Sequence, residues 1–281
     1  MSMWEVAMKP AIAVITMIFF LLAGGSNCGA EGGTAATFIA KGDAAYKKFD
    51  NRAAVKYYRT AFETEPKNYE AALKLARAYV DVGEKLSDTK ERRVYYEKGY
   101  DCAQKAVAIN PDGSKGHLFL SIAIGRVALD AGAKERVKLS KEVKSEVDKA
   151  LALDAQDDVA WHVLGRWHRR LSSLSWIEKN FANMFLGGVP KEASMQNAVD
   201  CFKKAIQLNP AHINHHLELG ITYEEMGKKD LAVAAYRNVL ELPIGDADDQ
   251  DHKKEAEERL KKMGRPVFRQ SRYKSPLTSL K

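Results

Sequence analysis

Small and large apolar side chains recur along this chain in a fixed order, shortly before a residue that ends a helix. The order is small, aromatic, small, and it is seen in Ala54, Tyr58 and Ala61 before Pro66 and in Ala198, Phe202 and Ala205 before Pro210. Two antiparallel helices approach closely only where small side chains lie at their crossing, while an aromatic side chain fills the neighbouring gap and proline ends the second helix. The pattern therefore predicts a succession of helical hairpins.

A second pattern marks the first helix of each hairpin, which is expected to begin three residues after each terminator. Trp161, Leu164 and Gly165 form the sequence W-x-x-L-G in such a helix. Together the two patterns are those of the tetratricopeptide repeat, whose period is about 34 residues. We therefore expect an all-α protein, a tetratricopeptide-like α-solenoid. It would be a right-handed superhelix of about five hairpins from 35 to 242, closed by a capping helix near 251–263.

The terminators lie farther apart than the repeat period requires, so each middle hairpin must hold extra residues. Segments 84–93 and 132–141 are charged and compatible with a helix, and we expect them to lengthen helices by several turns. A third insert, at about 170–194, is apolar. It carries Trp176, Ile177, Phe181 and Phe185.

Some of these residues resemble a known family. LGRW at 164–167, SLSWIEKNFANMF at 173–185 and the GGVPKEAS that follows are similar to the regulator of microtubule dynamics family, and the resemblance covers about 35–263. It implies a tetratricopeptide-like superhelix. Animal members of that family are associated with microtubules and spindle poles, and one is tethered to a membrane at organelle contacts. The N-terminus of this chain departs from the cytosolic pattern and favours an exported, bacterial-type member.

An apolar run at 11–25 follows Lys9 and precedes small residues that end at Ala30. The run is shorter than the roughly 20 residues of a spanning helix, and its form is typical of a signal peptide cleaved after Ala30. An uncleaved or lipid-modified membrane anchor over 1–30 is the alternative. We expect an exported protein, periplasmic or membrane-anchored. A cytoplasmic, cytoskeleton-associated protein is the alternative if the family's eukaryotic role applies.

Composition fits a soluble domain at 35–263. The 281 residues are 46% hydrophobic and 29% charged, which suits long helices with one solvent-exposed face, and the net charge is +7. The tail at 264–281 has basic residues and no acid, and we expect it to be disordered rather than a contact for anionic lipid or nucleic acid. No nucleic-acid partner is expected.

Cys102 and Cys201 fall two repeats apart and are expected to be free thiols.

No sequence motif of a nucleophile, a phosphate-binding loop or a metalloprotease is present, so we expect a protein that is not an enzyme and has no cofactor. His212, His215 and His216 form a cluster, but no cysteine or carboxylate stands at a matching spacing. They are interpreted as exposed polar residues at the start of a helix, and no metal is expected.

The repeat frame also predicts which side chains of the first helices face the concave groove of the solenoid. Those with a basic or histidine side chain are Arg77, Lys115, Arg126, His162, Arg166, Arg169 and Arg170. Arginine binds carboxylates bidentately, so a protein or peptide partner with acidic groups suits this groove. The sequence thus favours a protein-interaction scaffold. The alternative is a carrier of a lipid or other apolar ligand under the aromatic insert.

Overall fold

The computed structural model of the chain describes residues 33–265, except for 175–178, 181–182, 185–187 and 189. Within these residues all regular structure is helical. None of the helices described there combines the length and the apolar character that a membrane span requires. The N-terminal segment 1–30, the basic tail beyond 265, and Trp176, Ile177, Phe181 and Phe185 of the insert lie outside the described residues.

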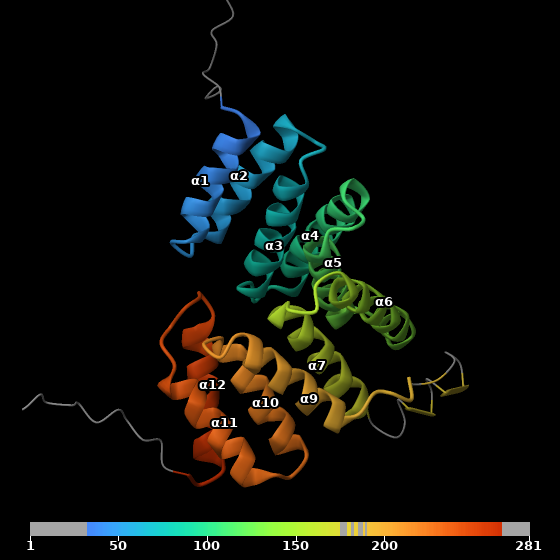
Figure 1. The fold of residues 1–281 in the computed structure, drawn as a ribbon, viewed down its shortest axis with the longest axis vertical. Helices are drawn as coiled ribbons and strands as arrows, with labels where there is room; N and C mark the ends of the chain where they lie inside the picture. Colours follow the sequence, from blue (N-terminus) through green and yellow to red (C-terminus); the bar gives the residue numbers. More distant parts are fainter. Residues whose placement is uncertain (1–32, 175–178, 181–182, 185–187, 189, 266–281) are drawn as a thin grey trace, which may run out of the picture. The chain divides into compact units, whose positions relative to one another are not determined.

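Among the described residues, helices α1–α7 and α9–α12 form five antiparallel hairpins and a final helix, as the repeat pattern predicts (Figure 1). The first helices of the hairpins are α1 (Ala35–Tyr46), α3 (Tyr69–Glu84), α5 (Ser114–Val127), α7 (Asp158–Ser172) and α10 (Ile213–Glu225). Their second helices are α2 (Asn51–Thr64), α4 (Thr89–Ile109), α6 (Ala133–Leu153), α9 (Met195–Leu208) and α11 (Lys229–Glu241). The last helix, α12 (Asp249–Lys262), begins two residues before the predicted capping helix.

The first helices form a layer of their own. α1 contacts α3, α3 contacts α5, α5 contacts α7, α7 contacts α10, and α10 contacts α12. Each second helix packs mainly against the first helix of its own hairpin and against the next first helix. We call α1, α3, α5, α7, α10 and α12 together the first-helix layer, and the residues predicted to face the groove lie on three of these helices, α3, α5 and α7.

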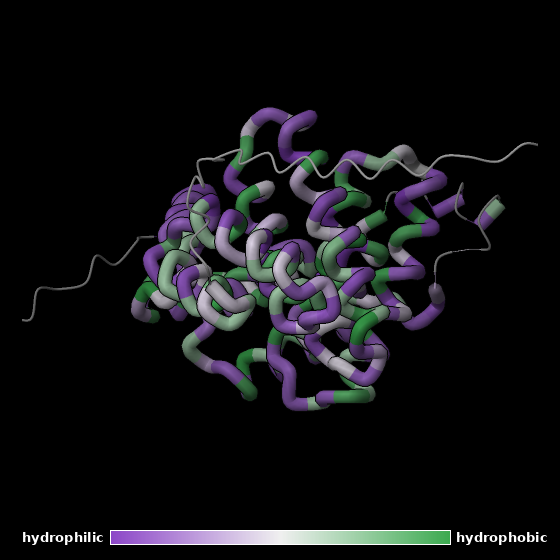
Figure 2. Tube along the Cα trace, turned by 90° about the horizontal axis from the view of Figure 1, so that it is seen from above, coloured by the Kyte–Doolittle hydropathy of each residue, from purple (hydrophilic) through white to green (hydrophobic). Residues whose placement is uncertain are grey.

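The helix crossings explain why the small and aromatic positions recur. A Cβ atom added to Gly165 of α7 would lie 2.9 Å from the Phe202 ring of α9, and one added to Gly220 of α10 would lie 2.5 Å from the Tyr236 ring of α11. Both rings are fully buried. Hydrophobic and hydrophilic positions alternate along the helical tube (Figure 2). α2 and α9 bury one face each, as amphipathic helices do, whereas α10 is buried on all sides from His215 to Tyr223.

The extra residues of the middle hairpins lengthen their second helices. α4 and α6 each have 21 residues, whereas α2 has 14, which confirms the helical interpretation for 133–141 and for 89–93, while 85–88 form the connection between α3 and α4. Cys102 and Cys201 are free and buried. Burial raises the pKa of the Cys102 thiol to about 11, so it holds no reactive thiolate at neutral pH.

The buried side chain of Asp157, at the start of α7, forms hydrogen bonds to both α7 and α5. Asp157 precedes α7, and its Oδ1 accepts the backbone N–H groups of Val159 and Ala160 at 3.0 and 3.2 Å. Its Oδ2 accepts a hydrogen bond of 2.8 Å from Lys115 of α5, and its side chain is 0% exposed. We expect Asp157→Ala to lower the free energy of unfolding by about 2–3 kcal/mol, because buried donors lose their acceptor.

Urea unfolding followed by circular dichroism measures this effect. The matched control is Asp88→Ala, since the exposed Asp88 caps α4 through one hydrogen bond to Glu91 N–H. Asp88→Ala should lower the free energy of unfolding by about 1 kcal/mol. Equal losses in the two variants would contradict the structural role given to Asp157.

Candidate functional site

Charged side chains join successive helices of the first-helix layer. The pairs are Asp43 with Lys74, Glu84 with Arg126, Lys115 with Asp157, Arg169 with Glu218 and Glu225, and Glu224 with Arg259. In each pair the two charges come from neighbouring first helices or from the residue that caps one. The layer is therefore held together by ion pairs on the same helices that were predicted to offer free charge to a partner.

Two of the predicted groove residues lie toward the N-terminal half of the layer. Arg77 is half exposed; its guanidinium lies 4.5 Å from the centre of the Tyr46 ring and 3.8 Å from the Asp81 carboxylate. Lys115 is also half exposed but already donates to Asp157. Each side chain thus has a polar or aromatic partner within the chain.

The remaining predicted arginines come together where α5 ends and α7 ends. Arg166, Arg169 and Arg170 share the last turns of α7, at the spacings that place side chains on one helix face. Arg126 comes from the end of α5, and Arg136 from the start of α6 joins them. We call these five residues the arginine cluster. Arg136 is the one member that the repeat frame did not select, because it lies on a second helix.

The described residues neutralise the arginine cluster only in part. Arg126 pairs with Glu84, Arg166 lies 3.4 Å from Glu218, and Arg169 contacts Glu218 and Glu225. No carboxylate among the described residues pairs with Arg170, which is exposed. Burial, and after it the charges of Arg166, Arg136, Arg169 and Arg126, lowers the pKa of Arg170. An additional anion at this point would relieve that repulsion.

Several donors of the arginine cluster also lack acceptors. The buried Nε–H groups of Arg126, Arg136 and Arg169 have no hydrogen-bond partner among the described residues. Buried donors are nearly always paired in folded proteins. The three glutamates of this region therefore do not satisfy the five guanidinium groups.

His162 does not lie on an exposed face. It is 5% exposed, packs against the Phe202 ring, and its Nδ1 lies 2.9 Å from Nδ1 of His215. Burial, and then the nearby His215 and Arg166, lowers the pKa of His162 well below its ordinary value. The side chain belongs to the contact between α7 and α10.

The interpretation of the histidine cluster as exposed polar residues was wrong. His215 is fully buried and His216 nearly so. Asp158, which is far from them in sequence, supplies the carboxylate that the spacing argument did not find: its Oδ2 lies 2.9 Å from Nε2 of His215. Burial alone would raise the pKa of Asp158, but the hydrogen bonds from His215 and Asn209 outweigh it and lower this pKa to about 2.

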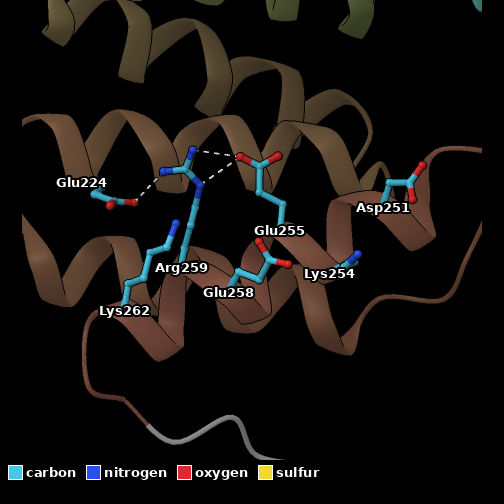
Figure 3. Close-up of a pocket in the computed structure, with 7 residues that line it drawn as sticks. All are labelled: Glu224, Asp251, Lys254, Glu255, Glu258, Arg259 and Lys262. Atoms are coloured by element: carbon cyan, nitrogen blue, oxygen red, sulfur yellow. Dashed lines mark hydrogen bonds and ion pairs between the residues drawn. The ribbon is translucent and has the colours of Figure 1, made fainter. Parts of the chain in front are cut away.

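A pocket of about 460 Å³ lies at the C-terminal end of the first-helix layer, between α10 and α12. Figure 3 shows Arg259 pointing between Glu224 and Glu255, with hydrogen bonds to both. The residues that line the pocket are all charged, with acidic and basic side chains intermixed: Glu224, Asp251, Lys254, Glu255, Glu258, Arg259 and Lys262. Such a lining suits a polar surface contact rather than an apolar ligand.

Comparison with known proteins agrees with this fold. The model of the family described as "Regulator of microtubule dynamics protein 1-3" matches residues 38–264. Regulator of microtubule dynamics protein 3 of Bos taurus is 32% identical over 186 residues, which are 66% of this chain and 39% of the bovine protein. Regulator of microtubule dynamics protein 2 of Rattus norvegicus is 27% identical over 183 residues, which are 65% of this chain and 44% of the rat protein.

Among solved structures, a thermophilic TPR protein of Thermus thermophilus superposes with a TM-score of 0.59 at 20% identity, covering 79% of this chain and 98% of that one. This likeness supports the tetratricopeptide-like solenoid. The aligned segments amount to about two fifths of the mammalian relatives' own length. The family model covers most of the sequence, from within α1 to the end of α12, and the chain therefore belongs to the regulator of microtubule dynamics family.

Proposed function

We propose that the chain is a non-enzymatic scaffold whose first-helix layer holds an acidic segment of a partner protein at the arginine cluster. The family and the tetratricopeptide-like fold support a role in protein interaction, since stacked hairpins present an extended surface for a partner. The observation that carries the finer proposal is Arg170, an exposed guanidinium among four others with no carboxylate partner among the described residues.

The chemistry of the arginine cluster favours carboxylate over other partners. A guanidinium presents a planar fork of donors that matches a carboxylate, and the pairing is stronger than one between neutral groups. Glu218 and Glu225 already occupy part of the cluster through Arg169. A peptide with several carboxylates pairs with Arg170 first and then competes with these glutamates for Arg166 and Arg169.

Reversal of one charge tests the proposal. We expect Arg170→Glu to weaken binding of a fluorescein-labelled oligoglutamate peptide at least about tenfold, because a bidentate charged pair is replaced by repulsion. Fluorescence anisotropy measures the affinity. An oligoglutamine peptide of equal length should not bind, and the affinity should fall with salt, which screens charges beyond about 8 Å at physiological ionic strength.

The matched control is Lys203→Glu. Lys203 is exposed on α9, a second helix, and the change in net charge is the same. Retained binding in this control and lost binding in Arg170→Glu support the arginine cluster. Equal binding by both variants would overturn the proposal. Arg166 and Arg169 are less suitable for the test, because reversing them sets new carboxylates against Glu218 and Glu225.

The names of the relatives suggest a second candidate, association with microtubules. Co-sedimentation of the full chain with assembled microtubules tests it, and Arg170→Glu tells whether the same cluster is used. Export or membrane anchoring through residues 1–30 also stays a proposal. Comparison of the N-terminus of the protein purified from its native host with the encoded one would decide whether cleavage occurs after Ala30.

A further inference from the structure

The loop before α12 and the first turn of that helix bring together two carboxylates and an imidazole. These are Asp246, Asp249 and His252, and each offers one ligand atom within 4.8 Å of those of the other two. The spacing of three residues places Asp249 and His252 on one face of α12. Carboxylate oxygen and imidazole nitrogen are both ligands of first-row divalent cations.

The geometry of Asp249 shows which of its atoms is left for a ligand. Its Oδ2 accepts the backbone N–H groups of Gly245 and Asp246 at 2.7 and 2.9 Å. Its Oδ1 is buried and has no hydrogen-bond partner among the described residues, and the side chain is 4% exposed. A buried charged oxygen without a partner is costly.

His252 supplies a matching unused atom. Its Nδ1 is also buried and without a hydrogen-bond partner among the described residues. It lies 3.7 Å from Oδ1 of Asp249, which is too long for a hydrogen bond. Two atoms that ligate one Zn²⁺ each lie about 2 Å from the ion and hence at most about 4 Å from each other, so one cation fits between them.

The neighbouring charges do not neutralise this group. Lys85, directly after α3, pairs with Asp248 and Asp251 at 2.5 and 2.9 Å, so its positive charge goes to other carboxylates of this helix start. Among the described residues no lysine or arginine forms an ion pair with Asp246 or Asp249.

We propose that Asp246, Asp249 and His252 form a binding site for a divalent first-row cation of the Zn²⁺ type, with water completing its coordination. The imidazole selects against Ca²⁺ and Mg²⁺, which prefer oxygen ligands alone. The cation ties the loop at 243–248 to α12 and supplies the positive charge that the two carboxylates lack.

The other group with metal-ligand spacing, Asp158 with His212 and His215, is less suited. Both nitrogens of His215 are already used, by Asp158 at 2.9 Å and by His162 at 2.9 Å. The rings of His212 and His215 are stacked, with centres 4.1 Å apart and planes inclined by 11°. The nitrogen lone pairs of the two rings therefore lie in nearly parallel planes and do not converge on one ion.

Zinc titration of the full chain, first stripped by a chelator, tests the proposal by calorimetry. We expect one Zn²⁺ per chain and no comparable binding of Ca²⁺ or Mg²⁺. Asp249→Asn and His252→Gln should each weaken binding by at least about tenfold, because even an outer-shell partner of a metal ligand contributes about 10- to 100-fold. Asparagine keeps an oxygen for the Gly245 and Asp246 N–H groups, so the loop stays capped.

The matched control is Asp251→Asn, which removes the same charge from an exposed residue of the same helix. It should bind Zn²⁺ as the unchanged chain does. His212→Gln, in the other group, should also bind normally. The proposal is overturned if the folded chain binds no Zn²⁺, if Asp249→Asn and His252→Gln bind it unchanged, or if only His212→Gln loses it. Far-ultraviolet circular dichroism of each variant establishes that it is folded.

Discussion

Gly165→Ala should destabilise the protein when Phe202 is present and stabilise it when Phe202 has been replaced by alanine. The new Cβ would lie 2.9 Å from a ring that is fully buried between α7 and α9, so the helices must separate, at a cost of about 1–3 kcal/mol. Phe202→Ala alone should cost about 3–5 kcal/mol through the cavity it leaves. In that background the clash is gone, and alanine is favoured over glycine in a helix by about 0.5–1 kcal/mol.

Urea unfolding of the four proteins in this double-mutant cycle measures the change of sign directly. Gly125→Ala is the matched control, since Gly125 is inside α5 and its added Cβ would have only one neighbour, Val143, at 3.9 Å. That substitution should stabilise the native protein. If Gly165→Ala has the same effect with and without Phe202, the aromatic ring does not fill the crossing as described.

The protein should also lose stability steeply as the pH falls below neutral. Burial lowers the pKa of His162, His168, His212 and His216, so these side chains stay neutral in the folded state at pH values where the unfolded chain is protonated. The unfolded state then binds more protons, and stability falls as the pH drops below the ordinary histidine pKa of about 6.5. Each histidine contributes up to about 1.4 kcal/mol per pH unit.

One carboxyl group opposes this trend at lower pH. Burial raises the pKa of Asp81 to about 6, so its folded form takes up a proton first, and that adds stability as the pH falls below 6. The window from about pH 7.5 to about pH 6 therefore reports mainly the histidines. Urea midpoints across this window should fall.

His216→Gln is the matched variant for the pH effect. His216 Nε2 lies 2.9 Å from the carbonyl oxygen of Pro210, and a glutamine amide keeps a donor for that oxygen without a proton to gain. Its stability should change less with pH than that of the unchanged chain. A stability that stays level or rises between about pH 7.5 and about pH 6 would contradict the assignment of neutral buried histidines.

The fold follows from the sequence because the helix crossings impose local and repeated requirements. Gly165 and Phe202 are close in space and belong to one hairpin, so the repeat frame predicts their contact from spacing alone. The lengthened helices are predicted for a similar reason, since charged inserts of helical composition fit only the ends of existing helices. These constraints act between residues of one hairpin, so they appear in the sequence as regular spacings and as charged inserts.

The candidate site depends on long side chains whose partners no spacing rule selects. The frame places Arg169 on the expected face, but Glu218 and Glu225, which hold it, come from the next repeat. Asp158 meets His215 in the same way, between two hairpins, so a local search for a carboxylate beside the histidines fails. Arg136 lies on a second helix and enters the arginine cluster only because α6 begins beside the end of α7.

The unequal lengths of the second helices bear on how the chain avoids mispairing. In arrays of identical repeats any hairpin can dock on any other, and exchange between molecules is a known failure of such folds. Here α4 and α6 have 21 residues while α9 and α11 have 14 and 13. Exchanging a long helix for a short one leaves about 10 Å of helix uncovered, at about 1.5 Å per residue. Helix length thus distinguishes the two long second helices, α4 and α6, from the short ones, α2, α9 and α11.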